Sequence, residues 1–155
     1  MATKQQTPLN HARQVLDIEL AGLKAVRSQL DGQFTAAVNI LKEALTRRNK
    51  LVVVGIGKSG NIGQKISATF NSTGATCVLL DTANALHGDI GLLEDGDVVL
   101  ALSYSGESDE IITLIPSIKR LNIAVISMTG NSSSTIAEES DVHLDVSVDQ
   151  EACPH

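Results

Sequence analysis

A single lysine stands in the glycine-rich stretch Gly55-Ile-Gly57-Lys58-Ser59-Gly60, which directly follows four apolar residues. Glycines let a backbone come close to an anion, and the start of a following helix offers N–H groups that have no partner within that helix. Ile62, Ile66 and Phe70 recur at helical spacing, so the order strand, glycine turn, helix is expected. With the positive charge of Lys58, this stretch is typical of a phosphate-binding loop.

Three interpretations of this turn compete. The spacing Gly55-x-Gly57-x-x-Gly60 matches the dinucleotide-binding fingerprint, and Asp81 lies where an acid for a ribose hydroxyl is expected. The pair Lys58-Ser59 is typical of an ATP-binding P-loop, but that loop needs a glycine at position 52, where Val52 stands. The third interpretation is a sugar-phosphate site, which requires a second phosphate-binding loop nearby.

A cluster of serines supplies such a loop. The stretch Ser103-Tyr-Ser105-Gly106-Glu-Ser108 follows another apolar run and precedes a predicted helix. One interpretation is purely structural: Ser108 caps the helix, Gly106 makes a turn, and Asp109 and Glu110 favour the helix start. The other is that the three serine hydroxyls and nearby N–H groups surround a phosphate. A dinucleotide-binding fold has no need of serines here.

Alternating strands and helices must position both loops. Strands are expected at 51–54, 76–80, 97–102, 123–128 and 142–148, and helices at 61–72, 108–121 and 133–139. Two amphipathic helices precede them, the first over about 9–30 and the second capped by Asp31. We therefore predict an α/β three-layer sandwich with a five-stranded parallel sheet of order 2-1-3-4-5. Pro116 is expected to kink or split the helix at 108–121.

The predicted organisation has two parts. Residues 1–48 form an N-terminal helical segment that packs either on the domain or on a partner subunit, and residues 49–155 form the domain itself. In order 2-1-3-4-5, the carboxyl ends of strands 1 and 3 flank the ligand crevice. The lysine loop and the serine loop should therefore converge on one anion.

Composition excludes several classes of protein. The net charge of −6 argues against nucleic-acid partners and anionic membranes. The first residues lack a signal-peptide core, and no apolar run approaches the roughly 20 residues that span a bilayer, so a cytoplasmic location is expected. The two cysteines, Cys77 and Cys153, indicate neither a disulfide framework nor a zinc cluster.

Four motifs resemble one known family in their order along nearly the whole chain. They are Gly55-x-Gly-Lys-Ser-Gly-x-Ile-Gly63, Ala85-Leu-His-Gly-Asp-Ile-Gly91, Ser103-Tyr-Ser-Gly-Glu-Ser108 and Glu151-Ala-Cys-Pro154. Together they resemble the sugar isomerase (SIS) domain. The second and fourth motifs are similar to those of arabinose-5-phosphate isomerases, which feed Kdo synthesis for bacterial lipopolysaccharide.

The resemblance implies interconversion of D-arabinose 5-phosphate and D-ribulose 5-phosphate through an enediol, without a cofactor. By this resemblance the catalytic residues are Lys58, Glu110 and Glu151, and either glutamate can be the base. It also implies a homodimer or homotetramer. The residues expected to contact the phosphosugar are Gly57, Ser59, Gly74, Ala75, Asp81, His87, Ser103, Ser105, Gly106 and Ser108.

The chain departs from the family in two places. Where the family carries His-Pro-x-Glu, this chain reads Asp81-Thr-Ala-Asn84, so the zinc-binding histidine is replaced and no metal is expected. Family members also continue past the fourth motif into a further helix, another catalytic histidine and CBS domains. We therefore expect a truncated domain, and a sugar-phosphate-binding module without catalysis is the alternative function.

Overall fold

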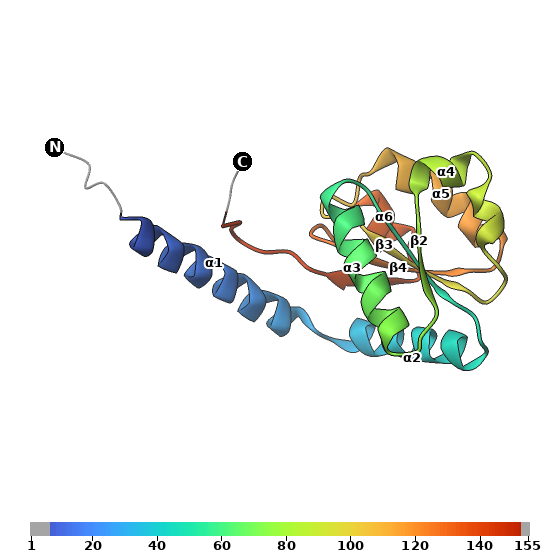
Figure 1. The fold of residues 1–155 in the computed structure, drawn as a ribbon, viewed down its shortest axis with the longest axis horizontal. Coiled ribbons are helices and arrows are strands. Elements are labelled where there is room, and N and C mark those ends of the chain that lie inside the picture. Colours follow the sequence, from blue (N-terminus) through green and yellow to red (C-terminus); the bar gives the residue numbers. More distant parts are fainter. Residues whose placement is uncertain (1–6, 153–155) are drawn as a thin grey trace.

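Five parallel strands form the central sheet of the computed structural model, which describes residues 7–152 of the chain (Figure 1). They lie in the order β2-β1-β3-β4-β5, so the predicted fold class and strand order are confirmed. The strands are β1 Leu51–Gly55, β2 Cys77–Leu80, β3 Val98–Leu102, β4 Ala124–Thr129 and β5 Val142–Asp145. The helices are α1 Pro8–Gln29, α2 Gly32–Thr46, α3 Lys58–Ser72, α4 Thr82–Leu86, α5 Asp109–Arg120, α6 Thr135–Glu138 and the 3-10 helix η1 Asp89–Leu92.

Helices cover both faces of the sheet, which is why β1 reads as a continuous apolar run. Val52 and Val54 point into a cluster closed by α4, α5 and α6. Leu51 and Val53 point into a second cluster closed by α2 and α3. At most 1% of the surface of each of these four residues is exposed. The three predicted layers follow from this alternation.

The two N-terminal helices behave differently. Asp31 caps α2 by accepting a hydrogen bond from the N–H of Gln33 at 2.8 Å, as predicted, and α2 buries Ala37 and Ala44 against the sheet. Helix α1 has no buried residue and projects away from the sheet (Figure 1). Thus α2 belongs to the body of the domain, whereas α1 leaves most of its surface open. None of the helices within residues 7–152 is long and apolar enough to cross a membrane.

Most element boundaries lie within two residues of the prediction, and three larger differences remain. Helix α3 begins at Lys58 rather than at residue 61, so the lysine lies in its first turn. Residues 82–92 form the short helices α4 and η1, for which no helix was predicted. Strand β5 ends at Asp145 rather than at 148. Helix α5 is not split at Pro116, because its apolar face is buried on the sheet over its whole length.

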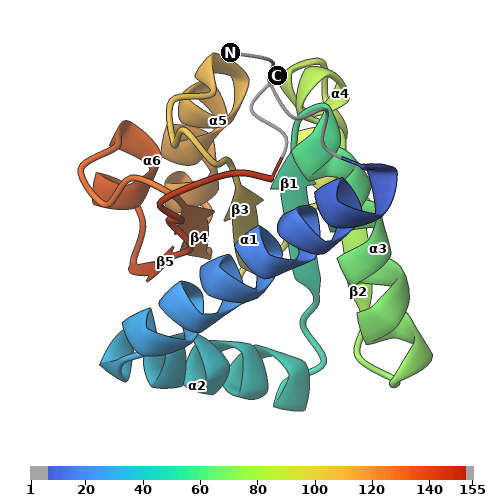
Figure 2. The same ribbon diagram turned by 90° about the vertical axis from the view of Figure 1, so that its left-hand side faces the viewer.

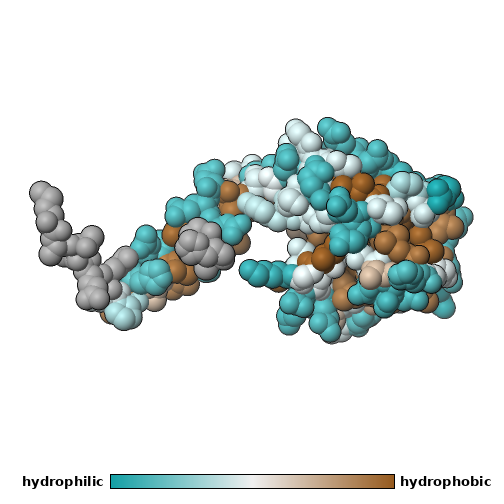
Figure 3. Space-filling view, turned by 90° about the horizontal axis from the view of Figure 1, so that it is seen from above, coloured by the Kyte–Doolittle hydropathy of each residue, from teal (hydrophilic) through white to brown (hydrophobic). Residues whose placement is uncertain are grey.

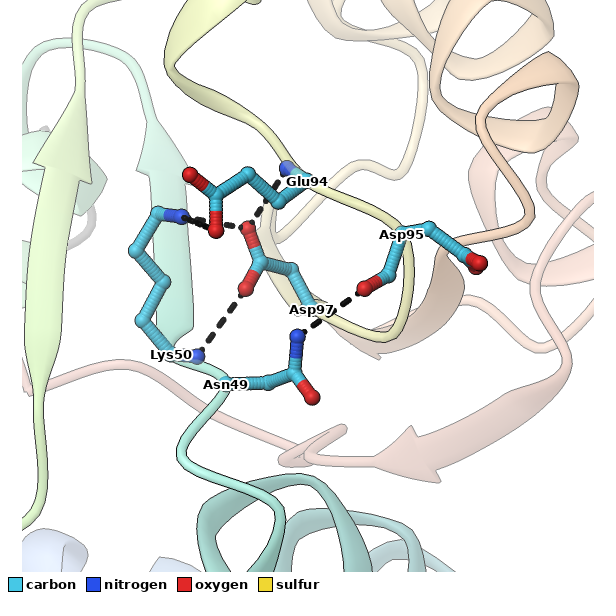
Figure 4. Close-up of polar contacts among 5 residues, drawn as sticks. All are labelled: Asn49, Lys50, Glu94, Asp95 and Asp97. Carbon is cyan, nitrogen blue, oxygen red and sulfur yellow. Dashed lines mark hydrogen bonds and ion pairs between the residues drawn. The ribbon is translucent and has the colours of Figure 1, made fainter.

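An ion pair ties β1 to β3 at the amino edge of the sheet (Figure 4). Nζ of Lys50 lies 2.7 Å from Oδ2 of Asp97, whose side chain is fully buried. The same carboxylate accepts hydrogen bonds from the N–H groups of Lys50 at 3.0 Å and Glu94 at 2.9 Å. These donors outweigh the desolvation of the carboxylate by burial, so the pKa of Asp97 is lowered. The negative charge of Asp97 is therefore paired at the amino edge of the sheet, opposite the edge where the ligand crevice is predicted.

Candidate functional site

The lysine loop and the serine loop are neighbours at the carboxyl edge of the sheet. Strand β1 ends at Gly55 and β3 at Leu102, and these two residues are partners in the parallel ladder. The loops that leave them must therefore run side by side. Figure 2 shows the start of α3 and the loop before α5 emerging from this edge. The predicted crevice lies where the strand order changes direction, between β1 and β3.

The glycine turn brings the start of α3 close to the end of β1. Gly57 has φ +56, a left-handed conformation that favours glycine. A Cβ at Gly60 would lie only 2.8 Å from the carbonyl oxygen of Gly55. A Cβ at Gly63 would lie 2.9 Å from Cγ1 of Val53 in the sheet. No side chain caps α3 at Gly57, but the carbonyl oxygen of Ile56 accepts the N–H groups of Ser59 at 3.1 Å and Gly60 at 3.4 Å. What this helix start offers an anion is therefore mainly the partial positive charge of the helix and the side chain of Lys58.

The serine loop is held by its own hydroxyls. Oγ of Ser103 lies 2.8 Å from Oγ of Ser108, and Ser103 also accepts the N–H of Gly106 at 3.2 Å. Ser105 accepts the N–H of Glu107 at 3.2 Å. Ser108 occupies the N-cap position of α5 but makes no side-chain capping bond. The predicted N-cap position of Ser108 is therefore confirmed, but its hydroxyl contacts Ser103 instead of the helix.

The neighbouring loop after β4 fixes the serine loop from outside. Gly106 has φ +68, and a Cβ there would collide with the side chain of Ser134. Glu107 accepts the N–H of Thr135 at 2.8 Å and so caps α6. The carbonyl of Tyr104 accepts the N–H of Gly130 at 2.8 Å. The loop is thus shaped before any ligand binds, which lowers the entropy lost on binding.

A cavity of about 650 Å³ opens beside the glycine turn and joins Lys58 to Glu151. This volume lies within the range of roughly 300–1,000 Å³ that is usual for small-molecule sites. One wall comes from α1 and another from the segment that follows β5. The lining residues are Ile18, Glu19, Gly22, Leu23, Val26, Lys58, Val148, Gln150, Glu151 and Ala152. Two of the three predicted catalytic side chains therefore share one cavity.

The third, Glu110, is not among the residues that line this cavity. It lies exposed in the first turn of α5, beside the serine loop and at the same edge of the sheet. Ser59, next to Lys58, is half-buried in the first turn of α3. The serine loop and the cavity therefore both lie at the carboxyl edge of the sheet.

Asp81 and His87 lie after β2, again at the carboxyl edge. Oδ1 of Asp81 accepts the N–H of Asn84 at 2.9 Å, so this side chain caps α4. His87 ends the same helix and is exposed. Within residues 7–152 there is no group of three or more His, Cys, Asp or Glu that could hold a metal ion.

Gly74 and Ala75 lie elsewhere. They precede β2, whose first residue Cys77 pairs with Leu51, the first residue of β1. This is the amino edge of the sheet, opposite Lys58 and the serine loop. The structure does not bring these two residues to the same site within one chain. The remainder of the fourth motif, Cys153 and Pro154, lies outside the described residues.

Sequence reasoning missed the wall that α1 contributes. The residue that could have indicated this wall is Gly22, a glycine in the middle of an amphipathic helix. A Cβ at Gly22 would lie 3.2 Å from Cγ1 of Val148, so the glycine allows close approach of the segment after β5. Figure 1 shows that segment, in red, running back toward α1.

The fold and the geometry of this edge are those of an anion-binding α/β domain. The sequence model of the SIS domain family matches residues 44–154, and the chain belongs to that family.

Two curated relatives cover most of the chain. Arabinose 5-phosphate isomerase KdsD of Pseudomonas aeruginosa is 44% identical over 146 residues, which are 94% of this chain and 44% of that protein. KdsD of Yersinia pestis is 47% identical over 143 residues, 92% of this chain and 42% of that protein. The chain therefore spans less than half the length of these relatives. A solved structure of an Escherichia coli CFT073 protein in complex with arabinose 5-phosphate has a TM-score of 0.80 and 32% identity, covering 96% of this chain and 79% of that one.

Proposed function

We propose that this chain is the isomerase domain of an enzyme that interconverts D-arabinose 5-phosphate and D-ribulose 5-phosphate. The observation that carries the proposal is the single cavity that both Lys58 and Glu151 line, beside the open start of α3. The names of the relatives and the arabinose 5-phosphate in the E. coli structure support this choice of sugar. We place the reaction in Kdo and lipopolysaccharide biosynthesis in the cytoplasm.

The phosphate is assigned to the edge between β1 and β3. The start of α3 has no capping side chain, and the serine loop adds hydroxyls and N–H groups next to it. Two uncapped helix starts, those of α3 and α5, carry partial positive charge toward the same crevice.

The sugar carbons then reach the cavity. The reaction needs a base that removes the proton from C2 of the aldose, and a proton must be returned to C1 of the enediol. We assign the base role to Glu151 because it lines the cavity with Lys58. Lys58 stabilises the negative charge that develops on the enediolate oxygen. Glu110, beside the serine loop, is the alternative base.

We further propose a homodimer or homotetramer that uses α1. This helix buries none of its residues, and its exposed leucines are Leu9, Leu16, Leu20 and Leu23. Hydrophobic side chains lie along the projecting helix in Figure 3. An apolar stripe of this kind is typical of a protein interface. Any role of Gly74 and Ala75 in sugar binding would require such a second copy, since they lie at the opposite edge from Lys58.

The direct test uses the natural full-length protein and residues 1–155 alone. Each is incubated with arabinose 5-phosphate, and ribulose 5-phosphate is measured. Turnover by the full-length protein supports the isomerase. Calorimetric binding of the sugar phosphate without turnover in either form would select the non-catalytic binding module. Absence of both binding and turnover would refute the proposal, and a measurable affinity for NAD would favour a dinucleotide site.

A further inference from the structure

One side of α1 forms a wall of the cavity that holds Lys58 and Glu151. The residues of α1 that line it are Ile18, Glu19, Gly22, Leu23 and Val26. Glu19 is the only ionisable side chain among these five. It makes no hydrogen bond or ion pair with any other residue in the described range 7–152. A carboxylate therefore faces this cavity with its hydrogen-bonding capacity unused by the protein.

Two contacts hold this wall in place. Nε2 of Gln29, at the end of α1, donates to the carbonyl oxygen of Ser147 at 3.2 Å and lies 2.9 Å from its Oγ. Two turns earlier, Gly22 lies against Val148 closely enough that a Cβ would be 3.2 Å from Cγ1. Ser147 and Val148 belong to the segment that carries Glu151. The helix and the segment with the proposed base are therefore fixed to one another.

The charges divide the crevice into two ends. The serine hydroxyls and the uncapped start of α5 suit the phosphate at the end near β3, and the start of α3 lies between this end and the cavity. At the cavity end the ionisable lining residues are Lys58, Glu19 and Glu151. Two carboxylates repel a phosphate, but they accept hydrogen bonds from sugar hydroxyls. Since Glu151 is assigned to proton transfer, Glu19 is the carboxylate left to bind hydroxyl groups.

We infer that Glu19 is a specificity-determining residue whose carboxylate accepts hydrogen bonds from hydroxyl groups of the phosphopentose. This role rests on the proposed isomerase function. It assigns to the N-terminal helix a part in recognising the sugar, whereas the phosphate is bound by the sheet edge. Loss of the Glu19 carboxylate should therefore weaken binding of the sugar hydroxyls and leave binding of the phosphate group unchanged.

The test compares Glu19→Ala and Glu19→Gln with the control Asp17→Ala in the natural full-length protein. Asp17 is a carboxylate of the same helix that lines a neighbouring groove and not this cavity. Steady-state turnover gives KM and kcat for arabinose 5-phosphate, and inhibition by inorganic phosphate gives the affinity of the phosphate end. Because hydrogen bonds to a charged group are involved, Glu19→Ala should raise KM by roughly 10–100-fold. Glu19→Gln keeps an acceptor oxygen and should show a smaller rise.

Inhibition by inorganic phosphate should stay within about twofold of the wild type in both Glu19 variants, and Asp17→Ala should change neither quantity. A KM within twofold of wild type in Glu19→Ala would overturn the role of Glu19 and leave the isomerase proposal standing. An equal loss of phosphate affinity would also overturn it, because it would indicate a general disturbance of the site. An inactive, non-binding wild type would instead refute the isomerase function, and the role of Glu19 with it.

Discussion

The hydroxyl oxygens of Ser103 and Ser108 lie 2.8 Å apart across the loop that joins β3 to α5. Ser108 stands at the N-cap of α5, where a serine usually accepts a hydrogen bond from its own helix. Here it contacts Ser103 at the other end of the loop instead. This contact closes the loop, and it leaves the N–H groups at the start of α5 without a capping side chain.

The first prediction concerns Ser108→Ala. Removing this hydroxyl should weaken phosphosugar binding by roughly tenfold. The loop loses both the contact that closes it and one of the hydroxyl groups proposed to bind the phosphate. The free energy of unfolding should change by less than about 1 kcal/mol, since no helix cap is lost. Calorimetric titration and urea unfolding measure the two effects. Ser72→Ala, an exposed serine at the far end of α3, is the control. A large loss of stability with unchanged binding would contradict this account.

Much of this edge could be predicted from the sequence. The apolar runs indicated the five strands, and in order 2-1-3-4-5 the loops after β1 and β3 must be neighbours. The pairing of Gly55 with Leu102 confirms that adjacency. The prediction works because each strand is buried on both faces and therefore stands out as a continuous run.

What could not be predicted depends on contacts between distant segments. The wall formed by α1 exists because Gly22 meets Val148, far along the chain. The direction of the Ser108 hydroxyl depends on its distance from Ser103, which no local pattern encodes. The helices α4 and η1 were missed since each is too short for a periodic pattern.

The second prediction is that Lys58→Met lowers kcat for the proposed isomerisation by the full-length protein by roughly 10²–10³-fold, as for the loss of one oxyanion-stabilising group. Folding should be unaffected, because Lys58 is exposed. Lys65→Met is the matched control, since this exposed lysine lies two turns further along α3. Turnover assays and circular dichroism provide the measurements. Equal kcat in both variants would remove Lys58 from the mechanism.

The third prediction concerns pH and the amino edge of the sheet. The pKa of Asp97 is lowered in the folded chain, because Lys50 and two N–H donors outweigh desolvation. Above the unfolded-state pKa of about 3.9, the carboxylate is charged in both states and its full contribution is present. As pH falls toward the lowered folded pKa, the unfolded state takes up its proton first and stability is lost. Urea unfolding between about pH 2 and 6 should show this loss.

Asp97→Asn isolates that contribution. It leaves the ammonium of Lys50, whose side chain is 17% exposed, with only the exposed carboxylate of Glu94, 3.8 Å away. The cost should be about 3–5 kcal/mol at pH 7, and the pH dependence should flatten. Glu43→Gln removes a partner of Arg47 in an exposed ion pair and should cost less than about 1 kcal/mol. A similar loss of unfolding free energy in the two variants would mean that the buried ion pair of Asp97 stabilises the fold no more than an exposed one.

The last prediction tests the proposed use of α1 as an interface. Leu20 is 53% exposed in the single chain, on a helix that buries no residue. If a second copy covers it, Leu20→Glu places a charge in an apolar interface and should raise the dissociation constant by at least roughly 100-fold. Ala21→Glu adds the same charge at the next position, which faces another side of the helix. Sedimentation at graded concentrations should then show smaller particles for Leu20→Glu alone. An unchanged distribution in both variants would place any interface elsewhere, because a carboxylate buried against leucines without a partner cannot be neutral in free energy.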